Sequence, residues 1–204
     1  MINKIIELLI KEYPNAKCSL DYMTPLQLLI AVILSAQSTD AQINKLTPAL
    51  FKKFNTAKDF ANADIKELEQ YVKSSGFYKN KARNIQNTCK ILDEKYHGNV
   101  PNTMEELIQL PGVGRKTANV VMLNAFNKCE GIAVDTHAKR LSNRIGLSDE
   151  IDPLKIEQDL LRKIPKNNWH LMNHLFVDHG RAICTAKNPK CNNCCIETYC
   201  KKNI

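Results

Sequence analysis

Apolar residues recur with helical spacing along nearly the whole chain. The N-terminal segment places Ile2, Ile5, Ile6 and Leu9 on one face, and the same intervals of three and four residues return in later segments. No segment shows the strict alternation of apolar and polar residues that is typical of a half-buried strand. The pattern therefore predicts an all-α protein of about ten short helices joined by short loops.

Start and stop signals divide this pattern into helices. Thr24 followed by Pro25 is typical of a helix start, and the residues after it, 26–36, are apolar nearly all round, which predicts a fully surrounded central helix. Two capping boxes begin at Asp64 and Thr103. Four glycines close periodic segments and predict helix ends: Gly76, Gly98, Gly146 and Gly180.

The charge balance narrows the choice of partner. The 204 residues include 29 Lys and Arg against 21 Asp and Glu, a formal net charge of +8. This excess favours a polyanion, with nucleic acid first and an acidic membrane surface second. The longest apolar run, residues 28–34, is far shorter than the roughly 20 residues that span a bilayer, and charged residues interrupt the N-terminal apolar pattern. We expect a cytoplasmic protein without a signal peptide or membrane segment.

Five of the eight cysteines lie within the last 21 residues. In a reducing compartment such crowding indicates a metal centre rather than disulfides. Four of them follow the spacing C-x6-C-x2-C-x5-C, which suits a zinc ion or an iron–sulfur cubane, with free thiols as a third alternative. We expect the centre to hold in place a tail too polar to form its own core, rather than to act in redox catalysis. These four are Cys184, Cys191, Cys194 and Cys200, because choosing the adjacent Cys195 would change the spacing.

A glycine hairpin separates two helical patterns at residues 110–118, where the sequence is LPGVGRKTA. Two glycines one residue apart permit a tight turn that leaves backbone N–H groups exposed at a helix N-terminus, and this is a geometry that binds an anion. The site suits one DNA phosphate. A simple turn between two helices is the alternative.

The hairpin string resembles the helix-hairpin-helix motif of the endonuclease III family of DNA glycosylases. The strings LSAQ at residues 34–37, VDTH at 134–137 and HGR at 179–181 resemble the same family, as does the four-cysteine loop. The resemblance covers nearly the whole chain and implies two helical domains. Residues 19–129 would form a six-helix barrel that includes the helix-hairpin-helix at about 104–125. Residues 1–18 and 130–204 would form a second domain, with a 4Fe-4S cluster in loop 184–200.

The resemblance also implies a nucleophile, Lys116, and a carboxylate partner, Asp135. An amine that attacks the anomeric carbon of the sugar displaces the damaged base and leaves a Schiff base, from which β-elimination cleaves the strand. Asp135 would stabilise the cationic sugar, orient the amine or carry its proton. By residue type alone, Lys116 could instead be a phosphate contact and Asp135 a helix N-cap.

The target base lies inside a duplex, so it must be flipped out and the gap filled. The resemblance implies that Gln37 fills the gap and that Phe77 wedges the opposite strand, at a position where the family usually has Leu. A buried core aromatic is the alternative for Phe77. His137 would contact DNA or Asp135, with a structural role as its alternative. The hairpin residues expected at the DNA backbone are Gly112, Val113, Gly114 and Arg115.

The expected function is base-excision repair by a monomeric enzyme. It would act on double-stranded DNA with damaged or missing bases, removing oxidised pyrimidines and cleaving the abasic site. We expect it to work in the cytoplasm, at the nucleoid. Two alternatives stay open: a pyrimidine-dimer glycosylase of the same family, and a DNA-binding iron–sulfur protein without catalysis.

Overall fold

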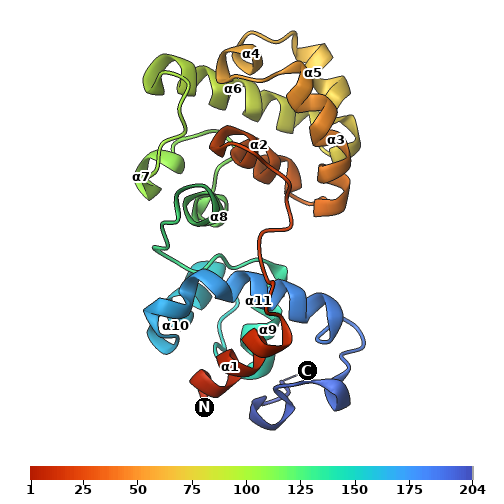
Figure 1. Ribbon diagram of the computed structural model, residues 1–204, viewed down its shortest axis with the longest axis vertical. Coiled ribbons are helices and arrows are strands. Elements are labelled where there is room, and N and C mark those ends of the chain that lie inside the picture. Colours follow the sequence, from red (N-terminus) through yellow and green to blue (C-terminus); the bar gives the residue numbers. More distant parts are fainter. Residues whose placement is uncertain (204) are drawn as a thin grey trace. The chain divides into compact units, whose positions relative to one another are not determined.

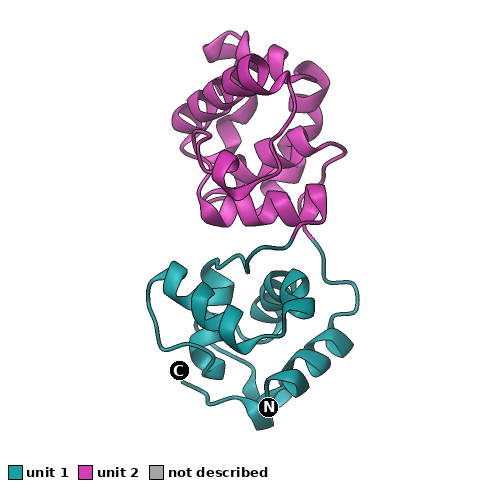
Figure 2. Ribbon diagram, turned by 90° about the vertical axis from the view of Figure 1, so that its left-hand side faces the viewer, with its two compact units in different colours: residues 1–17, 129–204 teal, residues 18–128 magenta. Residues whose placement is uncertain are grey.

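The structure, a computed structural model, describes residues 1–203 and is helical without a strand in that range. The chain forms two compact units (Figure 2). Unit 2 is the continuous segment 18–128, whereas unit 1 combines residues 1–17 with residues 129–204. The all-α prediction is confirmed for the described residues. None of the helices in residues 1–203 has the length and apolar character needed to cross a membrane.

Unit 2 is built around α2 (Pro25–Ser35), whose residues Leu28 to Leu34 are all buried. This confirms the central helix predicted from the apolar run. The side chain of Thr24 accepts a hydrogen bond from the N–H of Gln27, and α2 packs against α3, α6 and α8. The helices of unit 2 that follow α2 are α3 (Asp40–Lys53), α4 (Ala57–Ala61), α5 (Ile65–Val72), η1 (Lys73–Ser75), α6 (Tyr78–Tyr96), α7 (Met104–Leu107) and α8 (Arg115–Phe126) (Figure 1).

Unit 1 joins the two ends of the chain through one hydrophobic core. Ile5, Ile6 and Leu9 of α1 (Ile2–Glu12) pack into the same core as Phe176. Ile196, in the otherwise polar C-terminal tail, is also buried there. The remaining helices of unit 1 are α9 (Thr136–Ile145), α10 (Pro153–Lys163), η2 (Lys166–Asn168), α11 (Trp169–Ala182), η3 (Cys191–Asn193) and η4 (Glu197–Tyr199).

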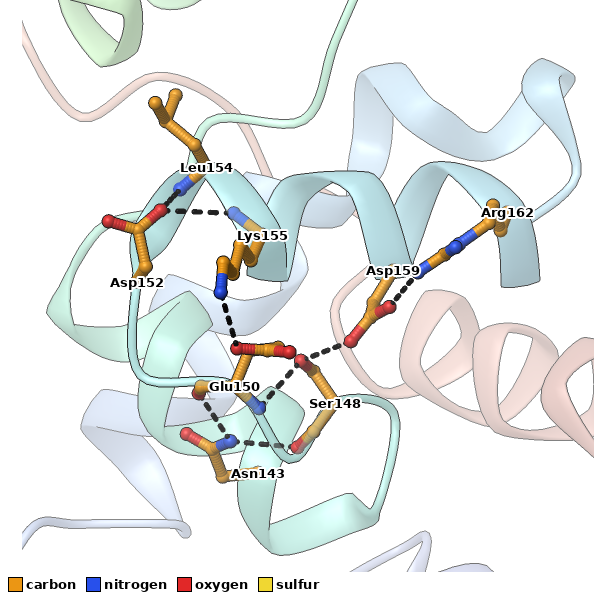
Figure 3. Close-up of polar contacts among 8 residues, drawn as sticks. All are labelled: Asn143, Ser148, Glu150, Asp152, Leu154, Lys155, Asp159 and Arg162. Atoms are coloured by element: carbon orange, nitrogen blue, oxygen red, sulfur yellow. Dashed lines mark hydrogen bonds and ion pairs between the residues drawn. The ribbon is translucent and has the colours of Figure 1, made fainter.

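A polar network fixes the loop between α9 and α10 (Figure 3). The side-chain amide of Asn143 donates to the carbonyls of Ser148 and Glu150, and the hydroxyl of Ser148 donates to Asp159 of α10. Asp152 caps α10 by accepting from two backbone N–H groups. The loop therefore carries its own hydrogen-bond partners and sets where α10 begins relative to α9.

Most of the predicted helix boundaries are confirmed. The side chains of Asp64 and Thr103 each accept a backbone N–H bond at the start of a helix. Gly146 ends α9 with a φ of 87°, and Gly76 and Gly98 also have positive φ, after η1 and after α6. The prediction for Gly180 is wrong, because α11 continues through it to Ala182.

The structure gives another reason for glycine at position 180. A Cβ atom there would lie 2.6 Å from Nδ1 of His137 and 2.9 Å from Nη2 of Arg140. Gly180 thus permits α9 and α11 to approach closely, and it does so inside a helix rather than at a helix end.

Gly180→Ala tests this packing. Alanine in a helix interior ordinarily stabilises by up to about 1 kcal/mol relative to glycine. Here we expect the free energy of unfolding to fall by about 1–3 kcal/mol, because the added methyl group overpacks the contact between α9 and α11. Urea unfolding followed by circular dichroism measures the change. Gly114→Ala is the control, since a methyl group at that position would have no neighbour within 4 Å; equal stability of the two variants would contradict the packing role.

Candidate active site

The predicted hairpin lies between α7 and α8 in unit 2. Gly112 has a φ of +77°, and a Cβ atom there would meet the side chain of Asn84 at 2.9 Å. Val113 is buried, and its N–H donates to the carbonyl of Leu110, so this residue holds the turn. Gly114 is the N-cap of α8 and contributes no side-chain cap. The first turn of α8 consequently begins at an exposed glycine.

Lys116 is the second residue of α8, and its side chain is exposed. The neighbouring Arg115 is exposed as well. Two residues of α6 contact the hairpin. The hydroxyl of Thr88 donates to the carbonyl of Pro111 at 2.9 Å, and the side chain of Asn84 lies against Gly112. The lysine therefore follows a turn whose backbone is fixed by another helix.

Asp135 belongs to unit 1, where it is the N-cap of α9. Its Oδ1 atom accepts a hydrogen bond from the N–H of Ala138 at 2.8 Å, so the N-cap alternative for this residue is confirmed. The side chain is half-buried. Since the cap uses Oδ1, the carboxylate keeps a second oxygen that this bond does not engage.

A cavity of about 160 Å³ in unit 2 brings together three of the predicted DNA contacts, Gln37, Phe77 and Gly112. Gln37 and Phe77 both have left-handed backbones, with φ of 54° and 46°. Phe77 is 68 % exposed, so the alternative of a buried core aromatic is wrong. The cavity is also lined by Asn84, which links it to the hairpin.

Lys81 is a residue of this site that the sequence motifs did not indicate. Its side chain is only 5 % exposed, and its Nζ donates to the carbonyls of Leu34 at 2.8 Å and of Ser75 at 2.6 Å. Burial lowers the pKa of this ammonium below its usual range. The one indication in the sequence was the position of Lys81 within the helical repeat. It precedes the buried Ile85 by one helical turn, which places it on the core face of α6.

The four predicted cysteines line one cavity in unit 1, whereas Cys195 lies outside that lining and packs partly buried against the core. Within residues 1–203, no three side chains of His, Cys, Asp or Glu are grouped closely enough to hold a single metal ion. The four cysteines thus face one shared cavity. Burial raises the pKa of Cys194 to about 11 and that of Cys200 above its usual range, so a bound cation would have to replace their protons.

Two arginines of α9 hold the loop that carries Cys184. Arg144 donates through Nη1 to the carbonyl of Thr185 at 2.7 Å and through Nη2 to that of Ala186 at 2.8 Å, and its Nη1 lies 3.5 Å from the Cys184 sulfur. Arg140 donates to the carbonyl of Cys184 at 3.0 Å. The guanidinium groups therefore supply the hydrogen bonds that this irregular segment lacks internally.

A histidine connects the cluster loop to α1. Nε2 of His179 lies 3.4 Å from the sulfur of Cys194, and Nδ1 lies 3.0 Å from the hydroxyl of Tyr13. Burial lowers the pKa of His179 to about 4, so the ring is neutral at neutral pH. A thiolate at Cys194 only accepts, and in that state Nε2–H donates to the sulfur while Nδ1 accepts from Tyr13.

His137 also has a protein partner, because its Nδ1 lies 3.1 Å from Nη2 of Arg140. The same Nη2 donates to the carbonyl of Gly180. The structural alternative for His137 is thus realised within unit 1, next to the N-cap Asp135.

Comparisons with known proteins give a matching family, similar relatives and similar solved structures. Residues 30–166 match the HhH-GPD superfamily of base excision DNA repair proteins. The chain is 50 % identical to endonuclease III of Synechocystis sp. over 97 % of its own length and 90 % of the relative's, and 44 % identical to that of Bacillus subtilis over 93 % and 87 %. A solved structure of a trapped endonuclease III–DNA covalent intermediate, an estranged-adenine complex, superposes with a TM-score of 0.94 at 44 % identity. That likeness covers 98 % of this chain and 94 % of the other.

Arg144→Met tests the role of the guanidinium in the cysteine loop. The variant leaves the carbonyls of Thr185 and Ala186 without this donor, and a hydrogen bond to a charged group contributes about 1.5–3 kcal/mol. We expect trypsin to cut after Lys187 or Lys190 about tenfold faster, because local opening precedes cleavage. Arg162→Met is the control, since Arg162 pairs with Asp159 at the surface. Equal cutting rates in the two variants would exclude this role.

Proposed function

The chain belongs to the endonuclease III family, base-excision DNA glycosylases and abasic-site lyases of the HhH-GPD superfamily, and from this premise we propose its substrate class and its catalytic residues. The enzyme removes oxidised pyrimidines from double-stranded DNA and then cleaves the abasic site through a Schiff base on Lys116. The observation that carries this proposal is the position of Lys116, exposed in the first turn of α8 behind the glycine hairpin. A covalent intermediate has been trapped with DNA in the 44 % identical relative.

The proposed reaction begins when the neutral amine of Lys116 attacks the anomeric carbon. A carbon–nitrogen bond forms as the glycosidic bond breaks, and the base leaves with the electron pair. Opening of the sugar gives a protonated Schiff base, which withdraws electrons from the adjacent carbon. Loss of a proton from that carbon then expels the 3′ phosphate by β-elimination. A water nucleophile would give glycosylase activity alone, so an amine nucleophile accounts for both steps.

Asp135 is the proposed carboxylate partner in this reaction. Its charge is opposite to the charge that develops on the sugar as the base departs. The hydrogen bond from Ala138 holds Oδ1 at the start of α9, which orients the carboxylate and leaves Oδ2 for the substrate or the amine proton. One side chain would thus serve as both helix cap and catalytic group.

The proposed DNA surface of unit 2 has two parts. The hairpin and the first turn of α8 bind one phosphate through backbone amides, with Gly112 and Gly114 allowing close approach, Val113 holding the turn and Arg115 adding charge. Gln37 and Phe77, on the rim of the 160 Å³ cavity, enter the gap that a flipped nucleotide leaves. On unit 1 we assign a DNA contact to His137, which follows Asp135 by two residues in the first turn of α9.

The cofactor we propose is a 4Fe-4S cluster held by Cys184, Cys191, Cys194 and Cys200. Four soft ligands that line one cavity suit a multi-iron body, and the spacing C-x6-C-x2-C-x5-C differs from the two C-x2-C pairs that are common in structural zinc sites. When bound, the cluster supplies covalent cross-links to a loop with little apolar packing of its own. Arg144 and His179 orient that loop by hydrogen bonds.

Units 2 and 1 would correspond to the six-helix barrel domain and the cluster domain of the family. The protein acts as a monomer on DNA with damaged or missing bases, in the cytoplasm at the nucleoid.

Metal content tests the cofactor. Purified protein is expected to be brown, to absorb near ~400 nm and to contain about four iron and four sulfide per chain. Cys194→Ser should lose most of this iron, whereas Cys195→Ser should keep it, because Cys194 lines the cavity and Cys195 does not. A colourless protein with stoichiometric zinc would replace the proposed cluster.

Lys116→Ala tests the nucleophile. We expect borohydride trapping of the protein on abasic DNA to fall at least about 100-fold, since no other amine would occupy the attacking position. Gel electrophoresis of the trapped adduct measures the effect. Lys90→Ala is the matched control, because Lys90 is an exposed lysine of α6 in the same unit. An undiminished adduct in the Lys116 variant would refute the assignment.

A panel of duplexes that carry different lesions tests the substrate class, with strand cleavage by the wild-type protein as the measured quantity. The wild-type protein is expected to cleave duplexes that carry an abasic site or thymine glycol. Cleavage of a cyclobutane dimer alone would favour the pyrimidine-dimer glycosylase, and cleavage of no duplex would favour the DNA-binding protein without catalysis.

A further inference from the structure

Two residues with strained backbones lie on the rim of the cavity in unit 2. Gln37 and Phe77 have φ of 54° and 46°, a region that residues other than glycine rarely adopt. Such a conformation costs free energy and persists only where the surroundings fix it. The exposed ring of Phe77 cannot fix its own backbone by packing, because its side chain is 68 % exposed. The constraint must come from the residues beside these two positions.

Lys81 supplies a constraint to both segments at once. Its Nζ donates to the carbonyl of Leu34, three residues before Gln37, and to the carbonyl of Ser75, two residues before Phe77. The carbonyl of Leu34 lies in the last turn of α2, where carbonyls lack helical partners and carry the negative end of the helix dipole. One ammonium therefore ties together two helix ends that lead into two loops, about 40 residues apart in the sequence.

Burial of the Lys81 ammonium costs free energy, and a purely packing role does not account for that cost. The ammonium is buried, and its hydrogen bonds go to carbonyl oxygens rather than to a carboxylate. Burying a charge without a countercharge is costly, so an apolar side chain would fill the same space with less penalty. The compensation is geometric, because only a donor with more than one N–H can hold two carbonyls at a fixed separation.

We propose that Lys81 is a positioning residue for base flipping. It holds the backbones that precede Gln37 and Phe77 at the spacing that lets both side chains enter an opened base pair together. The proposal rests on the proposed function, in which these two residues fill the gap. Lys81 acts through the two loops and is distinct from the phosphate contacts of the hairpin.

The test compares binding of two duplexes by wild-type protein, Lys81→Met and Lys81→Arg. One duplex carries a non-cleavable abasic analogue opposite 2-aminopurine, and the other is undamaged. Lys90→Met is the control, because it removes an exposed lysine from the same helix. The measured quantities are the ratio of the two affinities and, at saturating protein, the fluorescence change of the 2-aminopurine.

We expect Lys81→Met to lower the affinity ratio by on the order of tenfold while binding of undamaged DNA changes less than about twofold, because phosphate contacts do not depend on the two loops. The 2-aminopurine signal at saturation should fall as well. Lys81→Arg, which keeps several N–H donors, should restore at least about half of the ratio. Lys90→Met should leave the ratio unchanged.

Two results would overturn the proposal: an unchanged ratio and signal in Lys81→Met, or a loss of both affinities in parallel, which marks a purely structural lysine. If Lys81→Met does not fold by circular dichroism, Lys81→Leu takes its place, since it also removes the N–H donors and its ratio decides in the same way. Gln37→Ala and Phe77→Ala separate the role of Lys81 from the gap-filling function on which it rests. If neither lowers the ratio, the proposed gap-filling function fails; if both do and the Lys81 variants do not, only the role of Lys81 fails.

Discussion

The candidate site of unit 2 depends on one polar stripe along α6. Lys81, Asn84 and Thr88 are spaced by three and four residues, so their side chains leave the same face of the helix. Lys81 holds the segments before Gln37 and Phe77, Asn84 lies against Gly112, and Thr88 holds the carbonyl of Pro111. Segments distant in sequence are thereby fixed to one rigid element. Helices that carry a site in this way position it more accurately than loops could alone.

Unit 1 uses the same physical device with arginine in place of lysine. The chain from Cys184 to Cys200 has only short 3-10 turns, and Ile196 is its one residue in the buried core of this unit, within the part of the chain that the structure describes. Its carbonyls find donors on α9, in Arg140 and Arg144. In both units, a cation from a regular helix donates to backbone carbonyls of a segment distant in the sequence. Fixed loops of this kind are needed wherever side chains must meet a ligand in one geometry.

The sequence predicted the local structure well because local structure depends on neighbouring residues. The buried run of α2, the caps at Thr24, Asp64 and Thr103 and the turn at Gly146 follow from spacing and residue type. Gly180 was misjudged because its reason is a contact with another helix, which no local pattern contains.

The residues of the candidate site also differ in whether the sequence or only the tertiary fold identifies them. Lys116 and Asp135 were assigned through family resemblance, since residue type alone favours a phosphate contact and an N-cap for them. The N-cap at Asp135 is real, and it leaves the second carboxylate oxygen for the proposed chemical role. Lys81 was not predicted because its partners, Leu34 and Ser75, are identified only by the tertiary fold. A lysine in register with a buried helix face was the only hint.

The division of the chain into a continuous and a discontinuous unit also orders its biosynthesis. Unit 2 ends at residue 128, so all of its contacts can form while the ribosome is still translating the remainder. Unit 1 needs both α1, which is made before unit 2, and Cys200, which is made after it. Hydrophobic residues of α1 such as Ile5 and Leu9 therefore stay without their core partners until the segment after residue 128 has been made. The cysteine loop can close only after residue 200 has been made, when unit 2 can already have folded upstream.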